Sequence, residues 1–175
     1  MSERILHPAK DDSPFIPTGK PNQLPAGEAF KADPNVWYQL KVLYTDRNGK
    51  SASSFIYPLG KNPATSFWDY MAFNSPDGLP PAKFKVHPPK DNGFSEWELD
   101  DGNYLCLKAT GWVYRASLYR IGWAVLDGHL FNDYWGGPTG YQYDDVLVPK
   151  AYYIGMKLPV FICKLISAAD VKSVA

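Results

Sequence analysis

The sequence predicts an all-β fold: an antiparallel β-sandwich of the jelly-roll kind, or a barrel, with about nine or ten strands. Three observations favour this fold class. Short runs with strand-like alternation recur at spacings of roughly 8–12 residues. Asn48-Gly49 and Asp127-Gly128 have the sequence of two-residue hairpin turns, which join antiparallel neighbours. No interval between the runs contains the long helical crossover that parallel strands need.

The domain organisation follows from the proline distribution. With 175 residues, the chain has the size of one domain, which we expect over 35–175. Residues 1–34 are rich in proline, which breaks any regular period, so they predict an extended arm. Apolar side chains such as Phe30 can attach this arm to the domain or to a neighbouring subunit. The alternative is a mobile leader.

The first hairpin carries the clearest strand signal. Apolar and polar residues alternate over 36–45, which is typical of a half-buried strand. The sequence Asp46-Arg47-Asn48-Gly49 follows, and Asn-Gly between two strand-like runs favours a type I′ turn with positive φ at both central residues. The return strand is then expected over about 50–57.

The remaining elements are predicted in the same way. The aromatic segment 67–73 is compatible with a strand or a helical turn. Gly111 and Gly122 interrupt a β-rich block, where glycine permits a bulge or a bend. Ser167-Ala168-Ala169-Asp170 resembles a capping box ahead of a short C-terminal helix. The further strands are expected at 83–87, 94–99, 104–110, 112–120, 121–126, 129–131, 145–148, 151–156 and 159–166, with a loop over 132–145.

Charge and targeting signals limit the partners and the compartment. The 18 basic residues balance the 18 acidic ones, so the chain has no long-range net field to attract nucleic acid or an anionic membrane. The N-terminus lacks the apolar region of a secretory signal, and no apolar run is long enough for a transmembrane helix. We therefore expect a soluble protein that is cytoplasmic as synthesised, with unconventional secretion as an alternative.

The sequence offers few groups for catalysis. Cys106 and Cys163 lie within apolar runs and lack metal-ligand spacing, so we expect buried free thiols. The chain has three histidines, and no nucleophile elbow, zinc motif or phosphate-binding glycine loop occurs. Glu96 and Glu98 are two residues apart on a predicted strand and share a face, as the carboxylate pair of a glycosidase would. A solvated outer face explains them equally well, and we do not predict an enzyme.

The aromatic loop around residue 135 suggests the function. A sugar ring stacks its apolar face on an aromatic side chain, while its hydroxyl groups bind amides and carboxylates. This loop contains both kinds of residue, so we predict non-catalytic, lectin-like glycan binding with Trp135 as the stacking platform. The alternative is that the aromatic residues pack inward beneath the loop. The predicted ligand-binding residues are Trp135, Tyr134, Tyr141, Tyr143, Asn132, Asp133, Gln142 and Asp144.

No cofactor is required by this hypothesis, although Ca²⁺ is a candidate. Ca²⁺ takes six to eight oxygen ligands from flexible loops. The carboxylates near the aromatic loop that could supply them are Asp127, Asp133, Asp144 and Asp145. Aspartate is also what tight turns require, so the pattern has a purely structural explanation.

Two other functions use the same aromatic residues. Trp and Tyr favour membrane interfaces, so a toxin-like β-protein that contacts lipid is one alternative. Cationic side chains are expected beside the aromatic residues in that case, and the sequence does not place any there. The other alternative is a self-assembling structural or interaction protein, because Tyr and Trp are enriched at the interfaces of homo-oligomers.

Overall fold

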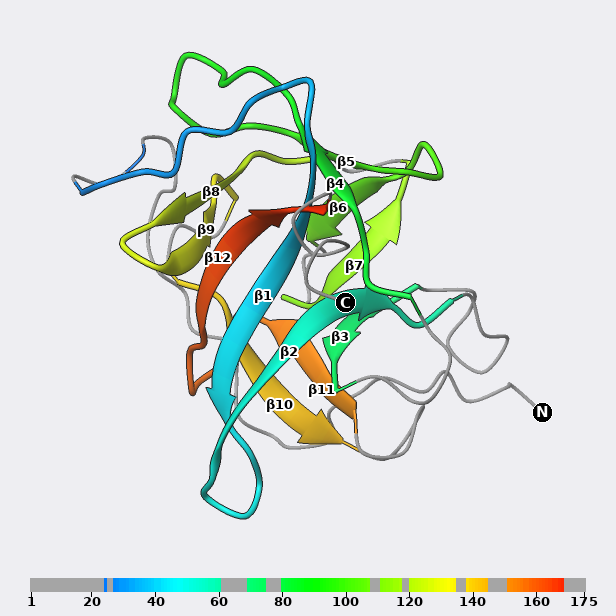
Figure 1. Cartoon of the computed structure of the whole chain (residues 1–175), viewed down its shortest axis with the longest axis vertical. Helices are drawn as coiled ribbons and strands as arrows, with labels where there is room; N and C mark the ends of the chain where they lie inside the picture. Colours follow the sequence, from blue (N-terminus) through cyan, green and yellow to red (C-terminus); the bar gives the residue numbers. More distant parts are fainter. Residues whose placement is uncertain are drawn as a thin grey trace.

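Twelve strands form the described part of the chain, which contains no helical element. The structure is a computed structural model that describes residues 24, 27–60, 69–74, 80–107, 111–117, 120–134, 138–144 and 151–168. All strand pairs are antiparallel, and the sheet curls into a half-barrel (Figure 1). The prediction of an all-β fold is confirmed. The strands are β1 (Trp37–Thr45), β2 (Ser51–Pro58), β3 (Met71–Phe73), β4 (Phe84–Val86), β5 (Trp97–Leu99), β6 (Tyr104–Leu107), β7 (Val113–Ala116), β8 (Trp123–Leu126), β9 (His129–Asn132), β10 (Gly140–Asp144), β11 (Ala151–Gly155) and β12 (Ile162–Ser167).

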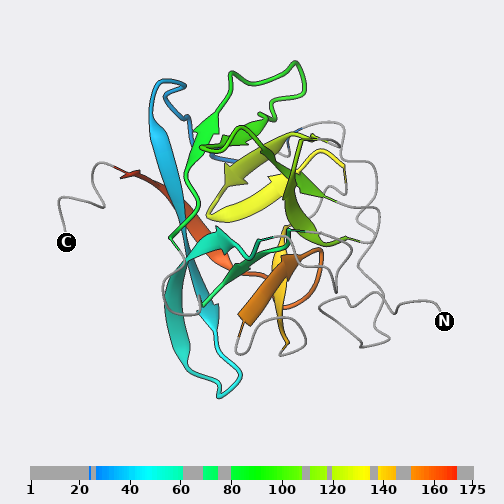
Figure 2. The same cartoon turned by 90° about the vertical axis from the view of Figure 1, so that its right-hand side faces the viewer.

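The main sheet has the strand order β10-β11-β3-β2-β1-β4-β5-β6-β7, and β12 pairs with β1 outside this path. Strands β8 and β9 form a separate hairpin. In Figure 2, β1, β2 and β12 lie together on the left, and β10, β11 and the β8–β9 hairpin lie to their right. The sheet curls far enough for Tyr114 of β7 to bridge Tyr70, next to β3.

The hairpin between β1 and β2 differs in detail from the predicted type I′ turn. Thr45 pairs with Ser51, which leaves a wider connection than two residues. Gly49 has φ of 81°, whereas Asn48 has no positive φ, and the Gly49 amide donates to the Asp46 carbonyl. The Asp46 carboxylate also accepts the amides of Asn48 and Lys50. This carboxylate stabilises a type I turn followed by a left-handed glycine, a common longer hairpin connection.

The second predicted hairpin turn is confirmed. Asp127 and Gly128 have φ values of 51° and 78°, and they connect β8 directly to β9. Positive φ at both central residues defines the type I′ turn. The turn also serves the packing of the domain, because the Gly128 carbonyl accepts the amide of Cys163 in β12.

Two apolar clusters stabilise the fold, one on each side of the curled sheet. The larger cluster lies beneath β1 and includes the fully buried Leu40, Trp97, Trp123 and Phe161. The smaller one lies where β7 returns towards β3 and β11, and it consists mainly of aromatic residues. Alternation along β11 separates the two, because Tyr152 belongs to the larger cluster and its neighbour in sequence to the smaller one.

Several elements differ from the sequence prediction or lie outside the described residues. The loop predicted over 132–145 is wrong for 140–144, because these residues form β10 and pair with β11. Residues 71–73 of the undecided aromatic segment form β3. The strand predicted at 145–148 and the C-terminal helix after Ala168 fall on residues outside the described ranges.

The described end of the predicted arm lies on the domain. The Phe30 amide donates to the Val125 carbonyl, and the Asp127 amide donates to the Glu28 carbonyl. Residues 28–30 therefore extend the β8–β9 hairpin by one short antiparallel segment. The proline-free interval between Pro25 and Pro34 is long enough for such a pairing.

Candidate functional site

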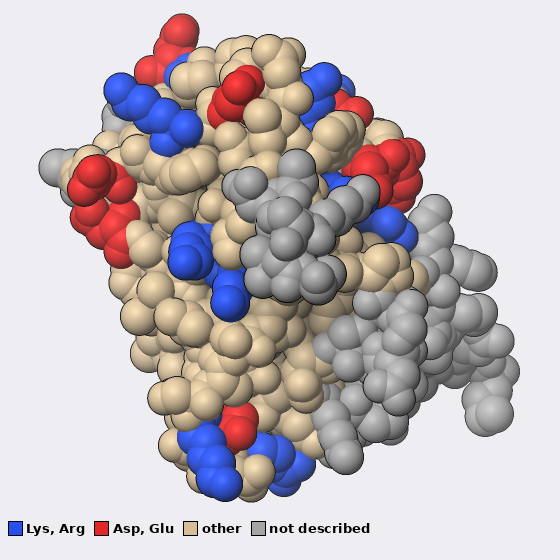
Figure 3. Space-filling view, in the orientation of Figure 1, with Lys and Arg blue, Asp and Glu red and all other residues tan. Residues whose placement is uncertain are grey.

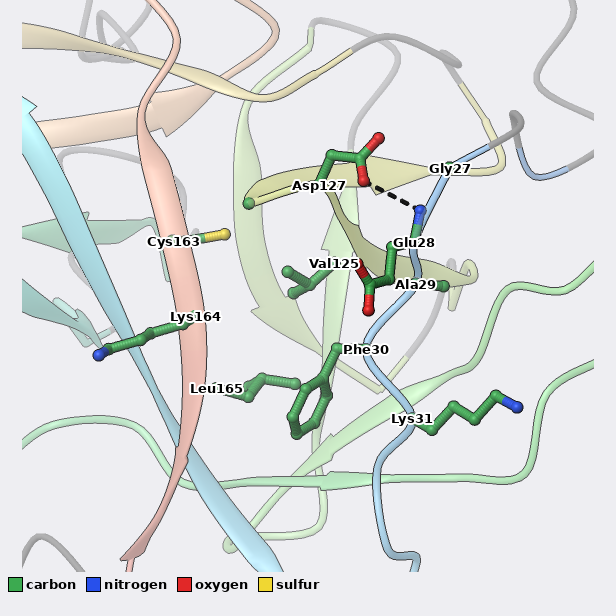
Figure 4. A pocket seen from close by; sticks show the side chains of 11 residues that line it. Gly27, Glu28, Ala29, Phe30, Lys31, Val125, Asp127, Cys163, Lys164 and Leu165 are labelled. Carbon is green, nitrogen blue, oxygen red and sulfur yellow. Dashed lines mark hydrogen bonds between the residues drawn. The ribbon is translucent and has the colours of Figure 1, made fainter.

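An open groove with a volume of about 890 Å³ lies between the arm and β12. Its walls come from residues 27–31 of the arm, the end of β8 with its turn, and residues 163–165 of β12. We call it the arm groove. Figure 4 shows the arm and β12 on opposite sides of it, with Val125 between them. The groove lies at an open edge between two β-layers.

The lower part of the arm groove is apolar. Leu165 and Phe30 point towards each other across it (Figure 4). The Phe30 ring is 44% exposed and makes an edge contact with Tyr38, with ring centroids 5.6 Å apart. This contact fixes one edge of the ring and leaves a large part of its surface open. An exposed, supported aromatic ring in a groove suits a flat apolar ligand surface.

Carboxylates supply the polar part of the arm groove. The Asp127 carboxylate accepts the backbone amide of Glu28 at 2.9 Å, which fixes the course of the arm. The side chain of Glu28 extends into the groove, whereas those of Lys31 and Lys164 point away from it (Figure 4). The Glu28 carboxylate makes no hydrogen bond or ion pair with any residue that the structure describes. It is therefore open to a ligand.

A second hollow lies on the other side of the arm, with a volume of about 440 Å³. It shares Phe30 and Val125 with the arm groove, and residues 86–89 form its far wall. Its lining is mainly apolar, and Trp97 and Trp123 at its base are almost completely buried. The arm thus separates an open, partly polar groove from a smaller apolar cleft.

Three residues of the predicted glycan loop, Asn132, Asp133 and Tyr141, take part in contacts within the domain. Asn132 is fully buried, and its amide contacts the sulfur of Met156 at 3.4 Å. Tyr141 is 4% exposed, and its hydroxyl donates to the Thr45 carbonyl and accepts the Thr45 amide. Asp133 accepts the Gly122 amide and binds the Lys90 ammonium at 2.6 Å. The polar groups of these three predicted ligand-binding residues are engaged within the protein.

The other predicted residues are placed differently. Tyr134 is 50% exposed. Tyr143 is half-buried and lies under the guanidinium of Arg47, 4.3 Å from the ring centroid. Gln142 is half-buried on the opposite face of β10 from its tyrosine neighbours. Asp144 pairs with Ala151 through its backbone, and Trp135 lies outside the described residues.

The candidate Ca²⁺ ligands are not assembled into a site within the described ranges. No group of three or more His, Cys, Asp or Glu side chains gathers there. Asp127 and Asp133 accept hydrogen bonds from different backbone segments, at Glu28 and Gly122. Asp145 lies outside these ranges. Asp127 and Asp133 therefore each hold a backbone segment in place.

Several other ionisable groups are engaged by neighbouring side chains. Asp69 is buried and binds Arg115 through Nε and Nη2, each at 2.6 Å, and Arg115 also contacts Asp101. Burial raises the pKa of Asp69 against the lowering effect of Arg115. Glu98, one of the two predicted strand carboxylates, contacts His87 at 2.8 Å. These contacts join neighbouring strands and turns.

Cys106 and Cys163 form no disulfide and are buried, as expected from their apolar surroundings. Burial raises the pKa of both Cys106 and Cys163 to about 12. Because the thiolate is the reactive form, neither sulfur is suited to nucleophilic chemistry near neutral pH. Cys163 lines the arm groove as an apolar side chain.

Comparison with protein-family models, with curated proteins and with solved structures finds no match to this chain. Within the described ranges, no helix is long and apolar enough to cross a membrane. The geometry of the arm groove is therefore the basis for a functional assignment.

Two residues of the arm groove, Glu28 and Phe30, were not predicted as site residues from the sequence, because they belong to a proline-rich arm. The proline-free interval around them was the available signal.

Proposed function

We propose that the protein binds glycans without catalysis, in a lectin-like manner, and that the arm groove is the binding site. The observation that carries this proposal is the pairing of an exposed aromatic ring, Phe30, with an unengaged carboxylate, Glu28, in one open groove. The proposed function is the one inferred from the sequence, but the proposed site is the arm groove instead of the loop at 131–145.

The chemistry of a sugar fits this pair of residues. One face of a pyranose presents C–H groups, which pack on an aromatic ring, and its rim presents hydroxyl groups, which donate to a carboxylate. The groove volume of about 890 Å³ lies within the usual range for ligand sites. The open form of the groove favours an end or a short segment of a longer glycan.

A glycan-array screen of the purified protein tests the proposal. The screen is run with Ca²⁺ and again with EDTA, followed by titration of the strongest hit against the variants. Phe30→Ala is expected to weaken binding at least about fivefold through loss of stacking. Glu28→Gln is expected to weaken it about tenfold, because hydrogen bonds to a charged group are the stronger ones.

Tyr134→Ala is the matched control, since Tyr134 is an aromatic residue of similar exposure on the predicted loop. We expect it to leave the affinity unchanged. Loss of binding in Tyr134→Ala, with Phe30→Ala unaffected, would return the site to the loop. Absence of any glycan hit would reject the function itself. Binding that disappears in EDTA would require metal ligands outside the described residues.

A further inference from the structure

The outward side of β2, β1 and β12 has an unusual composition. Alternation puts Leu40 and Val42 in the core, so Lys41 and Leu43 point outward. The pairing register puts Phe55 of β2 beside Lys41 on the same side, and Ile162 and Lys164 of β12 beside Leu43 and Lys41. We call this surface the outer face. None of its three strands contains an Asp or a Glu.

Two lysines face each other on the outer face. Lys41 is the cross-strand partner of Lys164, and like charges directly opposite each other destabilise a sheet. Neither lysine forms an ion pair or hydrogen bond with another described side chain. In Figure 3, basic side chains lie over β1 and β12, and the visible acidic ones lie towards the edges of the view. Within the described residues, the two lysines therefore form a cationic pair with no acidic partner.

Aliphatic side chains lie directly beside this pair. Leu43 and Ile162 are also cross-strand partners, and they are 51% and 53% exposed. They are two of the five large apolar side chains found to be exposed within the described residues. In an antiparallel sheet with one side in solvent, the residues that face the solvent are normally polar. Two adjacent exposed aliphatic residues beside two lysines instead form a cationic, amphipathic surface.

We propose that the outer face docks this protein on an anionic lipid bilayer. Lipid phosphates and carboxylates would neutralise Lys41 and Lys164, and Leu43 and Ile162 would enter the boundary between headgroups and acyl chains. The aliphatic pair favours a bilayer over a soluble polyanion, which offers it no apolar environment. The proposal is independent of glycan binding, because the lysine side chain of β12 points away from the arm groove (Figure 4).

Co-sedimentation with large vesicles tests this proposal with the full chain. One set of vesicles contains phosphatidylcholine alone, and the other contains phosphatidylcholine with phosphatidylserine. We expect binding only to the anionic set, and weaker binding as the salt concentration rises. Lys164→Gln is expected to weaken it about fivefold and Lys41→Gln/Lys164→Gln about 25-fold. Leu43→Ser/Ile162→Ser is expected to reduce it by at least about fivefold.

Two controls make these effects specific. Lys31→Gln removes one exposed charge from the arm and should leave vesicle binding unchanged. Tyr134→Ser removes an exposed aromatic side chain that follows β9, outside the outer face, and should also have no effect. Thermal unfolding of each variant checks the fold, and we expect Lys164→Gln to be at least as stable as the parent because it removes the like-charge pair.

Three results would overturn the proposal. The first is absence of binding to the anionic vesicles. The second is binding that the lysine and aliphatic substitutions leave unchanged. The third is binding to polyglutamate with none to vesicles, which would assign the outer face to an acidic protein segment. Glycan binding in the array with no vesicle binding would reject this inference and leave the proposed function intact.

Discussion

The aromatic residues of strand β10 and of the arm have opposite environments. Tyr141 of β10 packs among Tyr44, Phe73 and Tyr152, and its hydroxyl is bonded to Thr45. Phe30 of the arm contacts a single aromatic ring within the described part of the chain and is 44% exposed. Aromatic density along the sequence thus marks the core of this fold, and an isolated aromatic residue marks the candidate site.

Strand pairing accounts for the difference. Residues 140–144 pair with β11 on one side, and the larger apolar cluster lies beneath them. The position of Tyr141 in the strand is therefore enough to bury its side chain. Residues 28–30 pair with β8 at the margin of the sheet, where no further layer of the described chain covers the ring of Phe30. Substitutions in the two regions should therefore differ in their effects on stability, and the largest loss is expected within β10.

Tyr141→Ala should cause the largest loss of stability. It removes a buried ring and leaves a cavity among aromatic neighbours, so we expect the free energy of unfolding to fall by about 4 kcal/mol. Phe30→Ala should lower it by less than about 1 kcal/mol, because much of that ring is already exposed. Urea unfolding measures both values. Similar losses for the two variants would remove the contrast between core and site.

Gly140→Ala tests the start of β10. A Cβ atom at this position would overlap the carbonyl oxygen of Lys157, which is backbone and cannot move without disturbing the sheet. We expect a loss of about 3 kcal/mol in the free energy of unfolding. Gly49→Ala is the control, since open space surrounds Gly49 and only its positive φ opposes a side chain. An equal cost for both variants would show that steric contact does not distinguish Gly140.

Tyr141→Phe separates the hydroxyl from the ring. The hydroxyl makes two 2.9 Å hydrogen bonds with the backbone of Thr45. Removing it should lower the free energy of unfolding by about 1 kcal/mol, the usual contribution of an intramolecular hydrogen bond. A loss as large as that of Tyr141→Ala would mean that the hydroxyl, and not the burial of the ring, holds β10 against β1.

Ionisation of the two thiols predicts a pH dependence of the stability that appears only at alkaline pH. Their pKa values rise from 9.0 to about 12 on folding, so the unfolded thiols ionise first. Their contribution to stability is complete below pH 9 and is lost as the pH rises towards 12. At about pH 8, a disulfide reagent should therefore react with Cys163 only after denaturation. Rapid labelling of the native protein would show that the arm groove opens down to Cys163.

The sequence predicted most strands because alternation and turn chemistry are local properties. Residues 36–45 and Asp127-Gly128 are clear examples, since each pattern determines its own backbone conformation. Strand β10 was missed because Gly140 and the adjacent Gly-Pro segment resemble a loop, whereas its pairing with β11 is a long-range property. The arm groove was missed for the same reason. It exists only once the arm meets β8 and β12.

The most direct test of the central claim is a titration of the ¹⁵N-labelled protein with the strongest glycan hit, followed by amide chemical shifts. If the arm groove is the binding site, the largest changes fall on residues 27–31, 125–128 and 163–165. Changes concentrated on residues 131–134 and 140–144, with the arm unaffected, would contradict this assignment and locate the glycan at the loop.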